Sequence, residues 1–247
     1  MSHWNPVDQM QDLVNKFGAE DRIKRFQSGE LVLVERNVTH TSPVDLDNGG
    51  ITFEKTRLNV EAFLDDQAKY LREVFNVGFP SHKKLKLPKV RQGFGWGVVR
   101  VRSLSAQRML DVLKPRFDGK LWQGYSNVDK ALDPAKEART TDKGAYGVWC
   151  RARREADDEH KNKSANDLVS LGINGMTEPE RIQLEGWFHW KTGGHLDLQN
   201  VTLSIGSRCL GGDVPSSYWH SGNGFDVYRF SAGDLGSGIR AREVVSL

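Results

Sequence analysis

Residues 206–247 constrain the fold of this chain more than any other stretch. Short apolar and aromatic runs alternate there with loops that are rich in glycine and polar residues. Such loops are too polar to form a core, so the pattern predicts short β-strands joined by surface loops. The loops also carry many aromatic and hydrogen-bonding side chains, which is typical of a rigid sheet that displays a binding surface.

The region before this tail predicts a strand followed by a helix. Residues 95–102 alternate in the way of a half-buried strand. Ser103 or Ser105 can then cap a helix that has apolar residues on one face and ends near Pro115. Residues 118–142 are expected to be mostly loop.

A second strand and helix are predicted next. Residues 146–153 read as a strand. Thr177 and Glu180 have the spacing of a capping box, so a helix should start there, run through Trp190 and stop at Gly193. Four short candidate strands complete the chain, at residues 201–205, 217–219, 225–230 and 239–245.

The chain is expected to have two parts. Residues 1–89 predict a mostly helical region with a short strand at 31–34 and a well-patterned helix that Asn59 caps. The lysine- and proline-rich segment 78–91 looks like a boundary. Residues 90–247 then form an α+β domain.

Three motifs stand near the end of the chain: Tyr218-Trp219-His220-Ser221, the aromatic run Phe225 to Phe230, and Gly238-Ile239-Arg240. Together with this order of elements, they resemble the C-type-lectin-like fold in the branch shared with formylglycine-generating enzymes. The resemblance covers residues 90–247 and implies a mixed sheet with two flanking helices. The same family includes ligand-binding variable proteins of diversity-generating retroelements, so it also implies a binding role.

The leading functional prediction is therefore a non-enzymatic module that binds a protein or another macromolecule. Trp, Tyr and Arg dominate binding hot spots because they bury large areas and also carry polar groups. The alternation in 225–230 predicts that Phe225 and Val227 face the core and that Tyr228 faces solvent. Trp219 could equally fill the core. The predicted ligand-binding residues are Tyr218, Trp219, His220, Asn223, Tyr228 and Arg229.

A nucleic-acid-binding protein is the first alternative. A run of basic residues could contact phosphates, although no aromatic residue is interleaved for base stacking and a solvated linker would have the same composition. The net charge of +3 does not by itself indicate nucleic acid. The residues of this run are Lys83, Lys84, Lys86, Lys89 and Arg91.

A metal- or cysteine-dependent enzyme on the same fold is the second alternative. Formylglycine-generating enzymes use a cysteine pair, whereas this chain offers only Cys209 in its C-terminal part. The oxygen donors and histidines have no standard ligand spacing, so no cofactor and no metal are expected. The groups considered are Asp213 with Asp226, His189 with His195 and Asp197, and the carboxylates Glu155, Asp157, Asp158 and Glu159.

Composition limits the cellular setting. Two cysteines, Cys150 and Cys209, are too few for a disulfide scaffold, which favours a reducing compartment. The N-terminus lacks a signal-peptide pattern, and no apolar run approaches the roughly 18 residues of a membrane span. We therefore expect a soluble cytoplasmic protein with no membrane partner.

Overall fold

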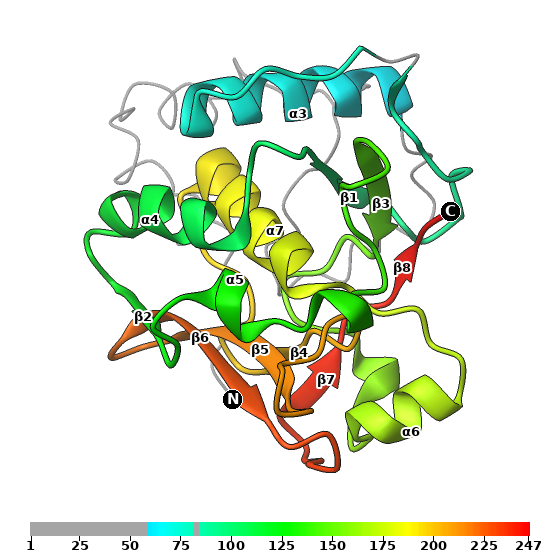
Figure 1. The fold of residues 1–247 in the computed structure, drawn as a ribbon, viewed down its shortest axis with the longest axis vertical. Helices are drawn as coiled ribbons and strands as arrows, with labels where there is room; N and C mark the ends of the chain where they lie inside the picture. Colours follow the sequence, from blue (N-terminus) through cyan, green and yellow to red (C-terminus); the bar gives the residue numbers. More distant parts are fainter. Residues whose placement is uncertain (1–58, 82–83) are drawn as a thin grey trace, which may run out of the picture. The chain divides into compact units, whose positions relative to one another are not determined.

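The computed structural model of the chain describes residues 59–81 and 84–247. They lie within one compact unit that combines helices with two β-sheets, so the predicted α+β class is confirmed (Figure 1). The elements predicted before Asn59, including the strand at 31–34, lie outside the described residues.

The described elements alternate along the chain. The helices are α3 (Val60–Phe75), α4 (Ala106–Arg116), α5 (Val128–Ala131), α6 (Ala165–Ser170) and α7 (Glu178–Thr192). The strands are β1 (Trp96–Arg100), β2 (Leu121–Gln123), β3 (Tyr146–Cys150), β4 (Val201–Leu203), β5 (Val214–His220), β6 (Gly224–Phe230), β7 (Ile239–Ala241) and β8 (Val244–Val245).

The strands form two sheets. One is antiparallel with the order β1-β3-β8, and the other is mixed with the order β2-β6-β5-β4-β7. In the mixed sheet β2 runs parallel to β6 and β4 runs parallel to β7. The predicted strand 239–245 is divided, because β7 belongs to the five-stranded sheet and β8 to the three-stranded one. The end of the chain thus connects the two sheets.

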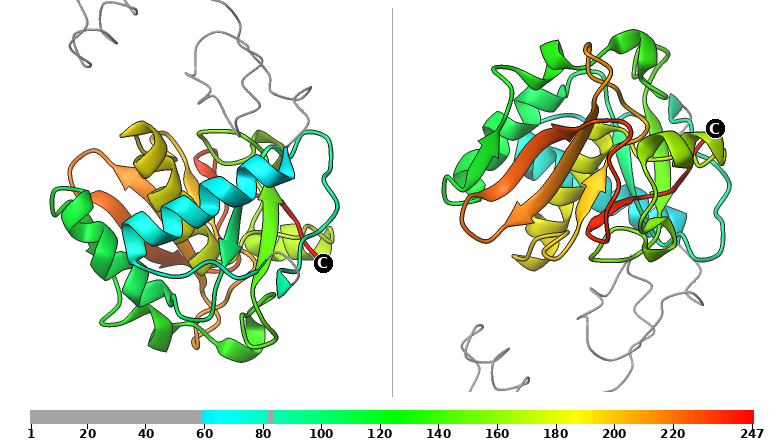
Figure 2. Two further views of the ribbon diagram at one scale, coloured as in Figure 1. Left: turned by 90° about the horizontal axis from the view of Figure 1, so that it is seen from above. Right: turned by 90° about the horizontal axis from the view of Figure 1, so that it is seen from below.

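Helix α7 lies at the centre of the unit. It contacts β1, β5, α3 and α4, and Figure 2 shows α3 over one side of it and the five-stranded sheet over the other. The predicted capping box is confirmed, since Thr177 and Glu180 bond each other's backbone N–H groups. Gly193 ends the helix in the left-handed region, with φ 70°. At Gly186 a Cβ would lie 2.4 Å from the Tyr70 hydroxyl, so glycine permits the close approach of α3.

Strand β1 differs from its prediction, because all five of its residues are buried rather than every second one. Its free edge is covered by two glutamines: Val99 N–H donates to Gln67 of α3, and Gln183 of α7 donates to the Val99 carbonyl. Helix α3 shares the core with residues 90–247, so the expected boundary at residue 89 does not separate it from the rest.

Candidate binding face

The β5–β6 hairpin carries the residues predicted to bind a ligand. The two strands are antiparallel, and Tyr218 pairs with Asp226 while Trp219 pairs with Phe225. Successive side chains of a strand point to opposite faces. Trp219 points inward, where its ring stacks on His195 at an interplanar angle of 13°. Of the predicted residues, Trp219 is therefore part of the support of the hairpin rather than of its outer face.

Phe225 and Val227 are fully buried, as the alternation of 225–230 predicted, and Tyr228 is exposed. Tyr228 has a partner that the sequence analysis missed. Trp122 of β2 lies beside it, with ring centroids 5.5 Å apart. The exposed fractions of Trp122 and Tyr228 are 45% and 42%, which is high for such large side chains.

Arg229 and Tyr125 lie next to this pair. The Arg229 guanidinium carbon lies 5.6 Å from the Tyr228 ring centroid and 5.7 Å from that of Tyr125, which is cation–π distance. The Tyr125 hydroxyl donates to the Tyr228 carbonyl at 2.6 Å. We call the exposed pair Trp122 and Tyr228 the aromatic face, with the Arg229 guanidinium at its edge and the partly buried Tyr125 supporting the Tyr228 backbone.

The position of the Tyr228 ring depends on a glycine, Gly124. A Cβ at Gly124 would lie 2.2 Å from Cδ2 of the Tyr228 ring, so no other residue fits there without moving the ring. Trp122 and Tyr125 both lie within 118–142, which we expected to be loop. A strand of three residues, β2, carries too little pattern to be predicted; the tryptophan next to Leu121 is the signal that could have drawn attention to it.

The other predicted residues gather at the turn end of the hairpin. Nδ1 of His220 accepts the backbone N–H groups of Gly222 and Asn223, at 3.1 and 3.2 Å. The Asn223 amide donates to Asp226 at 3.5 Å. Burial, together with the charge of Asp226 and a hydrogen bond to it, raises the pKa of Tyr218. Tyr218, His220 and Asn223 are thus brought together near the turn of the hairpin, whereas Tyr228 pairs with Ser216, farther from the turn.

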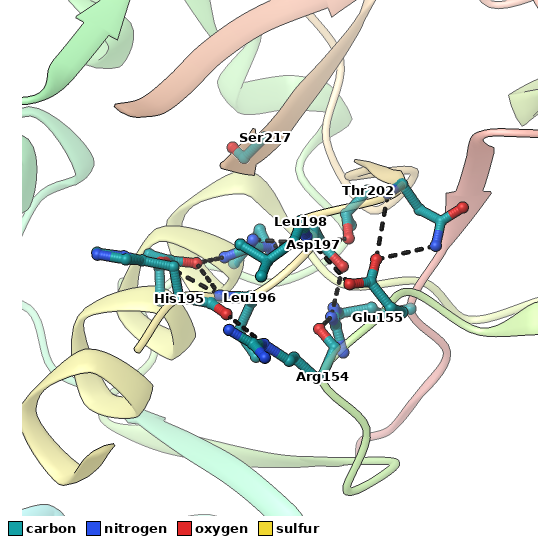
Figure 3. A network of polar contacts seen from close by, with 12 residues as sticks. Arg154, Glu155, His195, Leu196, Asp197, Leu198, Thr202 and Ser217 are labelled. Atoms are coloured by element: carbon teal, nitrogen blue, oxygen red, sulfur yellow. Dashed lines mark hydrogen bonds and ion pairs between the residues drawn. The ribbon is translucent and has the colours of Figure 1, made fainter. Parts of the chain in front are cut away.

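A buried network of charges supports the inner surface of the five-stranded sheet (Figure 3). Asp197 accepts two hydrogen bonds from Arg181, at 3.0 and 2.8 Å, and one from Arg242 at 2.6 Å. The Thr202 hydroxyl donates to the same carboxylate at 2.5 Å. Arg181 also donates to Glu185 at 3.0 Å. These five side chains are at most 1% exposed, so the network joins α7, β4 and the segment after β7 inside the protein.

The network touches the hairpin directly. The Arg181 guanidinium lies 5.4 Å from the Phe225 ring centroid, and Trp219 N–H donates to the Asp197 carbonyl at 3.1 Å. Glu178 accepts the hydroxyl of Ser217 from β5 and, at 2.6 Å, that of Ser204. The hairpin is therefore held by bonds as well as by packing.

The charges of this network are set by their surroundings. Burial alone would raise the pKa of Asp197, but the guanidinium groups of Arg242 and Arg181 outweigh it and hold the pKa below its usual range. Burial raises the pKa of Glu178, and its bonds from Ser204 and Ser217 offset only part of that rise.

The histidine group considered as a metal site does not form one. The His189 and His195 rings stack with centroids 4.6 Å apart, and His195 Nδ1 contacts Glu185 at 2.9 Å. Asp197 is engaged by arginines instead. Across residues 59–81 and 84–247, no group of three or more histidine, cysteine or carboxylate side chains could hold a metal ion. Asp213, the other oxygen donor considered, pairs with Arg229 at 3.1 Å.

The acidic run also separates onto different partners. Its carboxylates do not converge on one point, which agrees with the expectation that consecutive charges cannot. Glu155 accepts the backbone N–H groups of residues 198–200. The others pair with arginines: Asp157 with Arg151, Asp158 with Arg240, and Glu159 with Arg153.

Neither cysteine has the features of a nucleophile. Both thiols are free and buried, and burial raises the pKa of Cys150 to about 12 and also raises that of Cys209. Both are protonated at neutral pH, whereas thiol chemistry uses the thiolate.

The described lysines of the basic run 83–91 are exposed, whereas its arginine is engaged by other residues. Lys84, Lys86 and Lys89 are exposed, and Lys83 lies outside the described residues. Arg91 donates to Glu243 at 3.3 Å and covers the Phe94 ring. Among the four described cations of this run, Arg91 is thus already paired.

No family model, curated protein or solved structure matches the chain. Among the described residues, no helix combines the length and the apolar character needed to span a membrane.

Proposed function

We propose that this protein is a non-enzymatic binding module and that its aromatic face binds a protein. The observation that carries the proposal is the contact between two exposed aromatic rings, Trp122 and Tyr228, with Arg229 beside them. Tryptophan, tyrosine and arginine are the residues most enriched in binding hot spots. Large apolar side chains left side by side in water are typical of interaction surfaces.

The rigidity of the face supports the same proposal. Binding costs free energy when side chains or loops must become ordered. Here Tyr228 lies against Gly124, and its backbone carbonyl accepts a bond from Tyr125. Strand β6, which carries Tyr228, is also held in place by the contact of the Phe225 ring with the Arg181 guanidinium. A face that is already ordered loses little entropy when a partner covers it.

The arrangement of strands supports a C-type-lectin-like fold as part of this proposal. The first and last strands of residues 90–247 lie in one sheet, with β3 between them. Helix α7 contacts β1, and α4 contacts α7. In that fold the C-terminal sheet is the part that presents ligand-binding residues, and the aromatic face lies on the β2 and β6 strands of the corresponding sheet.

Removing either exposed ring should weaken binding without unfolding the protein. We expect Trp122→Ala and Tyr228→Ala each to weaken binding to a captured protein partner about tenfold or more, or about 1.4 kcal/mol. Capture from a cell extract on immobilised protein, followed by titration of the recovered partner, measures the effect. Leu171→Ala is the matched control, because Leu171 is an exposed apolar residue beside α6. Undiminished capture by a Trp122→Ala/Tyr228→Ala double variant would exclude the aromatic face as the site.

A further inference from the structure

We propose that a second site, lined by Lys86, Lys143 and Glu137, binds the phosphate group of a small molecule. It is a cavity of about 430 Å³ between the segment before β1, the loop 137–144 and the start of β3. This volume lies in the range of small-molecule sites. The cavity shares no residue with the aromatic face, so the inference is independent of the function proposed above.

The wall of the cavity is built before any ligand arrives. Arg139 forms a bidentate pair with Glu180, at 2.8 and 2.9 Å, and also donates to Asn174 and to the Gly175 carbonyl, both at 2.6 Å. Burial alone would raise the pKa of Glu180, but Arg139, with a smaller contribution from Tyr146, holds it below its usual range. Since Arg139 and Glu180 neutralise each other, they supply rigidity rather than net charge.

The unpaired positive charge of the cavity comes from its two lysines. Lys86 and Lys143 are exposed and both line the cavity, and no ion pair involves either of them within the part of the chain that the structure describes. The backbone of Lys86 is fixed by hydrogen bonds with Ala145 and Gly147 on the strand side. Two ammonium groups at one cavity attract an anion and repel a cation.

Glu137 determines which anion fits. Its Oε1 is buried and has no hydrogen-bond partner among the described residues, which is a costly state that a ligand could relieve. Burial raises the pKa of Glu137 to about 8; the Ser207 hydrogen bond opposes this, the charges of Glu180 and Glu178 add to it, and Arg139 lowers it only in part.

At neutral pH the Glu137 carboxyl is therefore protonated and can donate its O–H to a ligand oxygen. Two ammonium groups and one O–H donor match the several acceptor oxygens and the two negative charges of a phosphate monoester. Above pH 8 the same carboxyl becomes an anion and repels the phosphate. Affinity should therefore fall between pH 7 and pH 9, a range in which a monoester stays dianionic and lysine stays charged.

Calorimetric titration of the full-length protein tests the site, with inorganic phosphate and phenyl phosphate as separate probes. We expect saturable 1:1 binding at pH 7 and a loss of at least tenfold in a Lys86→Gln/Lys143→Gln double variant. A Lys130→Gln/Lys161→Gln variant removes two exposed lysines from other places and should bind as the wild type does. Tighter binding of phenyl phosphate would point to an organic phosphate, and equal binding to the free ion.

Glu137→Gln provides the second arm. The probe in this arm is phenyl phosphate, a monoester that stays dianionic over the range. The amide keeps an N–H donor but cannot ionise, so this variant should bind at pH 7 and should lose the decline towards pH 9. Absence of binding up to about 10 mM phosphate, or an equal loss in both lysine double variants, would overturn the site. If the affinity of Glu137→Gln falls between pH 7 and pH 9 as much as that of the wild type, Glu137 is not part of the site. Thermal melts of each variant verify that the fold is intact.

Discussion

Replacement of Asp197 by asparagine should lower the free energy of unfolding by about 3 to 5 kcal/mol, the usual cost of removing one partner from a buried ion pair. The variant leaves Arg181 and Arg242 buried with only Glu185 to balance them. Asparagine isolates the charge, because it fills the same space and tolerates the left-handed backbone at this position, φ 52°. Urea denaturation of the purified variant measures the loss.

Asp213→Asn is the matched control. Asp213 also pairs with an arginine, Arg229, but both side chains are 41% exposed. Exposed pairs contribute about 0 to 1 kcal/mol, so this variant should unfold nearly as the wild type does. If both variants lower the free energy of unfolding by the same amount, the burial of Asp197 does not increase the contribution of its ion pairs to stability.

The stability that the Asp197 network contributes should decrease in acid. The folded pKa of Asp197 lies below that of the unfolded chain, about 3.9, because its two arginines outweigh the effect of burial. Its contribution is therefore present above pH 4 and is lost as the pH falls through the lower, folded pKa. The difference in stability between the wild type and Asp197→Asn should narrow in acid. A difference that is constant from pH 7 to pH 2 would contradict the assignment.

Truncation of Phe225 to alanine should cost about 3 to 5 kcal/mol, the usual cost of a large cavity in a core. The ring is fully buried, packs edge-on against Phe117 and lies over the Arg181 guanidinium. For a domain of this size the expected fall in Tm is on the order of 10 °C. Scanning calorimetry measures it.

Tyr228→Ala is the partner experiment, three residues along the same strand. Its ring is 42% exposed, so its removal leaves little buried space empty. We expect a change in Tm of at most a few degrees, about 1 kcal/mol or less. A Tyr228→Ala protein that fails to fold would show that this side of β6 is core and that the binding surface lies elsewhere.

Local features of the sequence predicted much of this structure. The capping box at Thr177, the serine cap at Ser105 and the terminating Gly193 are each set by residues within one helical turn. The inward pair Phe225 and Val227 followed from the alternation of a single strand. These features depend on residues that are close in the chain, so their physical cause can be read from the sequence.

The sites depended on contacts between distant residues. Strand β2 has three residues and no pattern of its own; it exists because it pairs with β6, which brings Trp122 to Tyr228 across about a hundred residues of chain. Asp197 reads as a candidate metal ligand in the sequence and becomes a structural anion only because Arg181 and Arg242 reach it. The sequence alone determined the helix ends and the inward residues of β6. Tertiary packing decided which aromatic rings remain in water and which charges are buried, because both depend on pairs that no local pattern encodes.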